Sequence, residues 1–529
     1  MLVPIAVLLM GGAVALVLAG HTAGAGPSAA GWILALFAAG VAGFSRPGWT
    51  LVMLVGVLPI TPYLRYSTWI GGLLPEAVAA FCLTGAALSP SLRLNRSLED
   101  ERGPIAAPTV AFASLLLLSV VLVLLQRSPF VATLIGGGVF ANHWASLGSQ
   151  STLPVLRACG LLVGPVAGLV GLSLWRRREP HSGLEPEQLV TVVLVSGLIS
   201  LLVACGQAFV PNFPVPSLFP GVSGFYHNPV GLALLMTLIA PLAVVVSFDA
   251  SRQGRLRPLG FATLITGWLV FVSIGQRSAH LGVALGVTVA LTGWAVISVR
   301  RGRADARRVL VVAAISFALL VVGLALGVSR TAQWQQSLST LVDSPISTRW
   351  LGIGERGETN RMAFLMVAER PLGGYGIGGF EAALPAFYYQ VVLSQERYGP
   401  LARGSEHSIL NHPLHMAVDF GVFGLVGNLW LLAAFLVPAV GSVSRSAGLQ
   451  PLDRGDLLGL GCAAGFGSAL LLSIWTGEWM YDAAVSVPAF SLISIALIAT
   501  PSGGRHRLAA RWAMVALPLG HALMFVFGL

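Results

Sequence analysis

Long apolar segments separated by short polar ones run along almost the whole chain, and Arg, Pro and Gly mark their ends. A helix needs about 20 apolar residues to cross the hydrocarbon layer of a bilayer, and most of these segments approach that length. The predicted helices cover residues 2–20, 30–45, 48–62, 69–88, 108–126, 153–175, 188–209, 228–248, 257–275, 278–298, 308–328, 413–440, 456–475, 481–500 and 509–528. The pattern predicts an all-α polytopic membrane protein with about 12–15 transmembrane helices.

Arginines gather in the polar segments that fall on one side of these helices when the helices alternate in direction. The segments concerned hold Arg93, Arg96 and Arg102, then residues 176–178, 252–257 and 300–308, then Arg445 with Arg454, and finally residues 505–511. Basic residues favour the cytoplasmic side, so the long segment 329–411 is predicted to face outward. The chain then divides into N-terminal transmembrane helices (1–188), further transmembrane helices (189–328), one large outer loop (329–411) and C-terminal transmembrane helices (412–529).

The composition of the chain supports a membrane protein and excludes other classes of protein. The chain is 55% hydrophobic and 10% charged, with a mean hydropathy of +0.82, which excludes a soluble multidomain protein. The net charge of +10 comes from arginines placed as orientation signals, so nucleic acid is not an expected partner. The four cysteines, Cys82, Cys159, Cys205 and Cys462, stand alone in apolar segments, without the paired spacing of a metal site or a disulfide framework.

The outer loop is long, charged and rich in aromatic residues, a composition that argues against disorder. Its aromatic residues include Trp334, Trp350, Tyr375, Tyr388, Tyr389 and Tyr398. Residues 361–367 and 380–393 are predicted to form short helices that lie at the membrane interface and cap a cavity from outside.

Arg277 lies between two apolar segments with almost no loop to hold it in water. A charge at that depth is costly unless it is paired or faces a ligand. It is either an interfacial arginine that reaches the headgroups or part of an anion site, since a guanidinium offers a planar fork of donors to phosphate oxygens. His280, one helical turn later, would share its face.

A second candidate begins at Arg361, which opens a predicted helix that ends at Pro371 and a glycine-rich turn. Glycines such as Gly376 and Gly378 permit positive φ angles, so the turn either presents backbone N–H groups to an anion or serves only the fold.

Histidines mark the point where the outer loop returns to the membrane: His407, His412 and His415. Their spacing does not match known zinc motifs, so no metal site is expected. A neutral imidazole beside a membrane-embedded cavity is better suited to act as a general base on an acceptor hydroxyl. The chain also lacks a Walker loop, a paired-Asp nucleotide-sugar motif and a Gly-x-Ser-x-Gly turn, which leaves a lipid-linked donor as the consistent substrate.

In their order and spacing, these motifs resemble the O-antigen ligase and Wzy-type polymerase superfamily of bacterial membrane glycosyltransferases. The matching positions are Arg277, Arg361, the turn 371–380 and the run 411–424, preceded by a Gly- and Asn-Pro-rich segment at 224–233. The chain departs from the family pattern at Leu410, where the family carries its histidine.

The resemblance implies a GT-C-like fold in the bacterial inner membrane, with an active site facing the periplasm. It implies transfer of a glycan from an undecaprenyl-diphosphate carrier to another glycan or to lipid A-core, with inversion and without metal or cofactor. By the same resemblance Arg277 and Arg361 would bind the diphosphate, and His412 or His407 would be the base. The surrounding pocket would include His280, Tyr375, Gly376, Gly378 and Asn411. The alternative function is a lipid-linked oligosaccharide transporter or flippase, although the chain shows no internal repeat of the kind many transporters have.

Overall fold

The fold is helical throughout the residues that the computed structural model describes. These are residues 29–62, 74–89, 96–127, 153–176, 185–215, 222–226, 229–248, 256–274, 277–300, 311, 313–318, 320–322, 325, 355–380, 383, 387, 411–446, 455–476, 480, 482–497, 518–521 and 523. The helices are α2 (Ala29–Ser45), α3 (Pro47–Val57), η1 (Leu58–Ile60), α5 (Leu74–Leu88), α6 (Arg96–Arg127), α9 (Leu153–Arg176), α10 (Pro186–Phe209), α11 (Pro229–Phe248), α12 (Leu256–Ser273), α13 (Arg277–Arg300), α17 (Glu355–Glu369), α19 (His412–Ser446), α20 (Gly455–Thr476) and α21 (Ala483–Ala496). The described residues contain no strand, and seven of these helices have a stretch long and apolar enough to cross a membrane. The predicted all-α polytopic membrane fold is confirmed.

Most helices begin and end close to the predicted residues, because prolines open them and arginines follow them. Pro186 and Pro229 occupy the first positions of α10 and α11, where a missing N–H costs nothing. The prediction was wrong at α6, which begins at Arg96 rather than near residue 108. Its first turns contain Glu99 and Glu101, which are good helix formers and favour the positive end of the helix dipole. The predicted helix at 2–20 lies outside the described residues.

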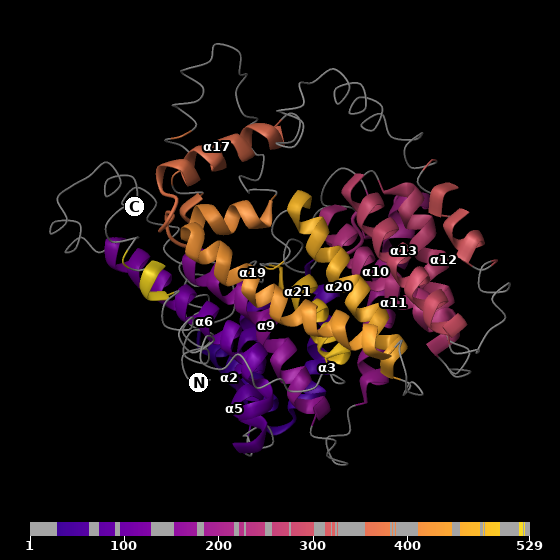
Figure 1. The fold of residues 1–529 in the computed structure, drawn as a ribbon, viewed down its shortest axis with the longest axis horizontal. Helices are drawn as coiled ribbons and strands as arrows, with labels where there is room; N and C mark the ends of the chain where they lie inside the picture. The colour runs from indigo at the N-terminus through magenta and orange to yellow at the C-terminus, as the bar shows by residue number, and fades with distance from the viewer. Residues whose placement is uncertain are drawn as a thin grey trace, which may run out of the picture.

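Helix α11 is the centre of one half of the bundle. It packs against α12, α13 and α20, and nearly all of its side chains are buried. Figure 1 shows it surrounded by these helices and α10. Close approach to α20 depends on Gly461 and Gly465, since a Cβ atom added at Gly465 would collide with the carbonyl oxygen of Leu238. Small residues of this kind let helix backbones meet inside a membrane.

The outer faces of the bundle carry apolar side chains that a soluble protein would bury. On α13, Leu281, Leu285 and Val289 recur at helical spacing and are all exposed, and on α12 Ile265 is 64% exposed. Continuous apolar faces of this kind are stable against lipid chains and unstable in water. The protein is therefore a multi-pass membrane protein.

Two helices stand apart from this regular packing at one end of the bundle. Helix α19 is broken at Gly421, and Figure 1 shows its two halves, in orange, running in different directions. Helix α17 packs against α19 and lies at the edge of the molecule. The short helix predicted at 361–367 is confirmed as part of α17, whereas most of the one predicted at 380–393 lies outside the described residues.

Candidate functional site

The glycine-rich turn after α17 is bound to the break in α19. At Gly421 the helix loses the bond that would join the N–H of Val422 to the carbonyl of Val418. The turn supplies a partner for each group: Tyr375 N–H donates to the Val418 oxygen (2.9 Å), and Val422 N–H donates to the Pro371 oxygen (2.9 Å). Both groups of the broken helical bond are thus satisfied, which buried backbone requires.

Glycine is needed at the centre of this junction because of both conformation and space. Gly421 has φ 63° and ψ −156°, a combination open essentially only to glycine. A Cβ atom at Gly421 would also collide with the backbone of Leu372 and Gly373, and one at Gly374 would collide with Val418 and Gly421. The turn and the break therefore form one unit in which two backbones touch.

The break folds the first half of α19 back over the second. His412, the first residue of the helix, lies beside the side chain of Asn428, which follows the break by two turns. The Asn428 amide in turn donates to the sulfur of Met480 (3.4 Å). His412, at the start of α19, is thereby buried inside the protein.

The side chain of Asp419, on α19, binds the glycine-rich turn through hydrogen bonds. Its carboxylate is fully buried and accepts from the N–H of Gly378 (3.1 Å) and, more weakly, from the N–H of Phe380 (3.4 Å). Gly376 N–H donates to the Asp419 carbonyl (2.8 Å), and Ile377 N–H donates to the Ser119 hydroxyl on α6 (3.1 Å). The turn does present its N–H groups to an anion, but that anion is a carboxylate of the protein itself.

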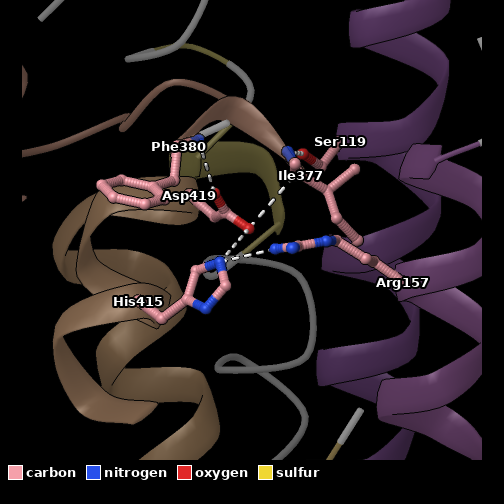
Figure 2. A network of polar contacts seen from close by, with 7 residues as sticks. Ser119, Arg157, Ile377, Phe380, His415 and Asp419 are labelled. Atoms are coloured by element: carbon pink, nitrogen blue, oxygen red, sulfur yellow. Dashed lines mark hydrogen bonds and ion pairs between the residues drawn. The ribbon is translucent and has the colours of Figure 1, made fainter. Parts of the chain in front are cut away.

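Next to Asp419, His415 meets an arginine from a distant part of the chain (Figure 2). Nη1 of Arg157, on α9, lies 2.6 Å from Nε2 of His415, and Oδ2 of Asp419 lies 3.6 Å from the same nitrogen. A guanidinium only donates hydrogen bonds, so Nε2 must accept and the ring carries its proton on Nδ1. His415 is therefore a neutral acceptor for Arg157, and its Nε2 lone pair is already engaged.

Two predicted pocket residues have structural partners. Asn411 is the N-cap of α19, since its side-chain oxygen accepts from the N–H of Leu414 (3.0 Å). His280 is fully buried, donates from Nε2 to the carbonyl of Phe271 (2.8 Å) and stacks edge-on against the Phe271 ring, which joins α13 to α12.

Tyr375 is also buried, with its ring edge-on to Phe387 and the Arg370 guanidinium 4.9 Å from its centre. Burial raises the pKa of its hydroxyl well above the usual value, and the Glu369 carboxylate raises the pKa further. The hydroxyl therefore stays protonated at neutral pH.

The two arginines predicted to bind diphosphate are placed only in part. Arg361 is exposed on α17, roughly opposite the buried Met362, Ala363 and Met366 that pack against α19. Arg277 opens α13, but its side chain lies outside the described residues, as does the whole of His407. Their convergence on one ligand stays a prediction. Among the described residues, no group of three His, Cys, Asp or Glu side chains is arranged to hold a metal ion.

Arg157 was not predicted from the sequence as a site residue. The signal was available, because this arginine stands about one turn inside the apolar segment that begins at Leu153. An ionisable residue within a membrane helix is costly and marks a functional candidate, which is the argument that singled out Arg277. What sequence could not supply was its partner, since 258 positions separate Arg157 from His415.

Comparison with known proteins agrees with the motifs. Residues 261–429 match the family model described as O-antigen ligase. The matched segment includes most of α12, all of α13 and α17, the glycine-rich turn and α19 as far as Leu429, beyond the break at Gly421, whereas Arg157 precedes it. A search of curated proteins gives no match to the chain. The motifs, the helical membrane fold and this match agree, and over residues 261–429 the chain is similar to the O-antigen ligase family.

Proposed function

We propose that the protein transfers a glycan from an undecaprenyl-diphosphate carrier to an acceptor at the periplasmic face of the bacterial inner membrane. The acceptor is lipid A-core if the protein is a ligase and another lipid-linked glycan if it is a polymerase. The observation that carries the proposal is the polar cluster of Arg157, His415 and Asp419, which joins the segment similar to O-antigen ligases to helix α9.

The predicted orientation of the helices puts this cluster at the periplasmic end of the bundle. Arg157 is near the start of α9, and His415 is near the start of α19. Both helices begin on the side that the arginine pattern assigns to the periplasm. A periplasmic site supports chemistry on a carrier whose glycan has already crossed the membrane.

The reaction needs an acceptor hydroxyl to attack the anomeric carbon of the donor sugar. The new bond forms as the bond to the phosphate oxygen breaks, so the configuration inverts and undecaprenyl diphosphate leaves. Arg277 and Arg361 are proposed to stabilise the charge on that leaving diphosphate, where fixed cations contribute most. Because diphosphate leaves readily, neither a metal nor a cofactor is part of the proposal.

His412 or His407 is proposed to take the proton from the acceptor hydroxyl. His415 is a poor candidate for that role because Arg157 occupies its Nε2 lone pair. Positioning of the two substrates by the surrounding helices would supply much of the rate.

An apolar groove supports the binding of a long lipid tail. A cavity of about 440 Å³ lies between α11, α12 and α13, and Phe248, Phe261, Phe271 and Val283 are among the residues that line it. From Phe261 to Phe271 the groove follows α12 for about 15 Å, and it crosses the middle of that helix. We propose that part of the carrier's polyprenyl tail lies in this apolar groove.

The test is transfer by the purified protein in detergent, with an undecaprenyl-diphosphate oligosaccharide as donor and either lipid A-core or a second lipid-linked glycan as acceptor. We expect a product with one acceptor, measured by mass spectrometry, and a loss of about 100-fold in rate for Arg277→Ala and for Arg361→Ala. Arg46→Ala, which removes another exposed arginine, is the matched control and should retain the wild-type rate. No product with either acceptor would refute the transferase, and unchanged rates in both variants would refute the diphosphate site.

One observation favours the transport alternative. The broken helix α19 carries ionisable residues beside the break, a feature shared with many transporters. In liposomes, transport would move the lipid-linked glycan between leaflets without changing it chemically. Movement without transfer would therefore assign the protein to the alternative.

A further inference from the structure

We propose that His521 is a positioning residue, whose imidazole closes the break in α19 and holds the first half of that helix in the position that glycan transfer needs. That half carries His412, one of the two proposed bases. The effect on transfer rests on the proposed function, whereas the closure itself rests on the contacts around Phe420. His521 lies 101 positions after Phe420 and outside the matched segment 261–429, so the C-terminal part of the chain would complete the site.

Three consecutive backbone carbonyl groups of α19 lie at the break. In a continuous helix the carbonyls of Val418, Asp419 and Phe420 would each accept from the N–H four residues later. Each of these bonds would span Gly421, whose dihedral angles are not helical. The glycine-rich turn supplies N–H groups to the carbonyls of Val418 and Asp419. Phe420 is fully buried, so its carbonyl oxygen needs a partner as the other two do.

The C-terminal segment supplies the partner of the Phe420 carbonyl. Nδ1 of His521 lies 3.3 Å from the Phe420 oxygen, and because a carbonyl only accepts, Nδ1 carries a proton and donates. His521 is fully buried, and its ring lies edge-on to the Phe420 ring, with 5.7 Å between the ring centres. A Cβ atom added at Gly520 would collide with the ring of Phe423. The segment therefore contacts α19 on both sides of Gly421.

The position of this bond makes it important for His412. The first half of α19 runs from His412 to Phe420 and continues into the second half through Gly421, and a glycine has access to a wide range of dihedral angles. The donor from His521 binds the last residue before this hinge, so it restricts rotation of the first half. Without that donor, we expect the first half to populate other directions and to carry the His412 side chain with it.

The test compares transfer by His521→Leu and His521→Asn in the full-length protein in detergent. The two new side chains have nearly the same shape and both lack the Nε2 atom, but only asparagine keeps an N–H donor near the position of Nδ1. We expect the Leu variant to lower kcat about tenfold and the Asn variant to restore most of it. The KM for the lipid-linked donor should change less than about twofold, because the arginines proposed to bind its diphosphate lie on α13 and α17. Leu519→Ala, at an exposed position of the same segment, is the matched control and should keep the wild-type rate.

Hydrogen–deuterium exchange of the backbone gives a readout that does not need activity. In His521→Leu the amides of residues 414–420 should exchange about tenfold faster than in the wild type, whereas in His521→Asn they should exchange nearly as in the wild type. The amides of residues 425–437, in the second half of α19, should be unchanged in both variants. A general loss of stability would instead raise exchange in both halves of the helix and would overturn the positioning role.

The outcomes separate this proposal from the proposed function. Wild-type protein that transfers no glycan, together with the expected difference in exchange between the two variants, would remove the transferase and leave the closure standing. Active wild-type protein, together with a Leu variant that transfers and exchanges as the wild type does, would overturn the closure and leave the transferase. Equal losses of rate in the two variants would also overturn it, because a packing role does not depend on a hydrogen-bond donor.

A measurement on the wild-type protein decides the question if His521→Leu does not fold. Nuclear magnetic resonance of the protein with isotope-labelled histidine reports which ring nitrogen carries the proton, and the spectrum of His521→Asn identifies the His521 signal. We expect a proton on Nδ1 of His521. A neutral ring with its proton on Nε2 alone would overturn the closure.

Discussion

Replacing Gly421 by alanine tests whether the broken helix and the glycine-rich turn form one unit. Alanine must adopt φ 63° and ψ −156° at this position, and its Cβ atom must fit against the backbone of Leu372 and Gly373. Neither neighbour can move as a flexible side chain would. The turn must therefore separate from α19, or the whole junction must be strained.

The magnitude follows from the strain and from the bonds at the junction. Forcing a residue with a Cβ atom into this region costs about 1–3 kcal/mol. Three backbone bonds cross the junction, from Tyr375 to Val418, from Gly376 to Asp419 and from Val422 to Pro371, and each contributes about 0.5–1.5 kcal/mol. Loss of even one bond together with the strain gives at least about 1.5 kcal/mol, which is about a tenfold change in the folding equilibrium.

The assay is the apparent melting temperature of the purified variants in detergent, measured beside the transfer rate. Gly441→Ala is the matched control, because it lies on the same helix in regular helical conformation and an added Cβ atom there meets nothing within 4 Å. It should be neutral or stabilising by up to about 1 kcal/mol. If Gly421→Ala melts with the wild type or with the control, the argument that the turn and the break are coupled is wrong.

Three further substitutions have definite expected results. Asn411→Ala removes the N-cap of α19 and should cost about 1 kcal/mol of stability, whereas Asn411→Ser should retain most of it; equal melting temperatures for the two would contradict the cap. Gly465→Leu places a side chain against the backbone of α11 and should prevent stable assembly, seen as aggregation in size-exclusion chromatography; a monodisperse, stable variant would disprove the close contact. Burial, and then the Asp482 carboxylate, raise the pKa of Tyr226 well above 10, so above about pH 10 the unfolded chain ionises first and stability falls. Tyr226→Phe should lose less stability than the wild type between about pH 9 and pH 11, and an identical loss would contradict this assignment.

The amino-acid sequence was sufficient to predict most helices, because their causes are local. Pro229 opens α11, a continuous apolar segment follows, and arginines come after it. In a bilayer an apolar segment of this length must be helical to satisfy its own backbone, so the prediction needs no knowledge of its neighbours. The resemblance to the O-antigen ligases could also be recognised, since the motifs keep their order along the chain, and the match at 261–429 supports it.

The candidate site could be read from sequence only in part. The glycines after Pro371 and the histidines after Asn411 were recognised as motifs, but their function as one junction was not. The hydrogen bond from the Gly378 N–H to Asp419 joins residues 41 positions apart, so no local pattern in the sequence predicts it. The turn was therefore open to two readings in sequence, and the carboxylate of Asp419 decided between them.

Sequence alone determined that this chain is helical, membrane-embedded and similar to the O-antigen ligases over part of its length, because hydrophobic length, arginine placement and motif order are properties of the chain itself. Only the tertiary structure decided that α19 breaks at Gly421 and that Arg157 meets His415. The physical reason is that a helix break is stable only when another segment satisfies the two groups it leaves unpaired. Similarly, a partly buried arginine in an apolar helix is stabilised by an acceptor, and in both cases the partner comes from a segment that is distant in the sequence.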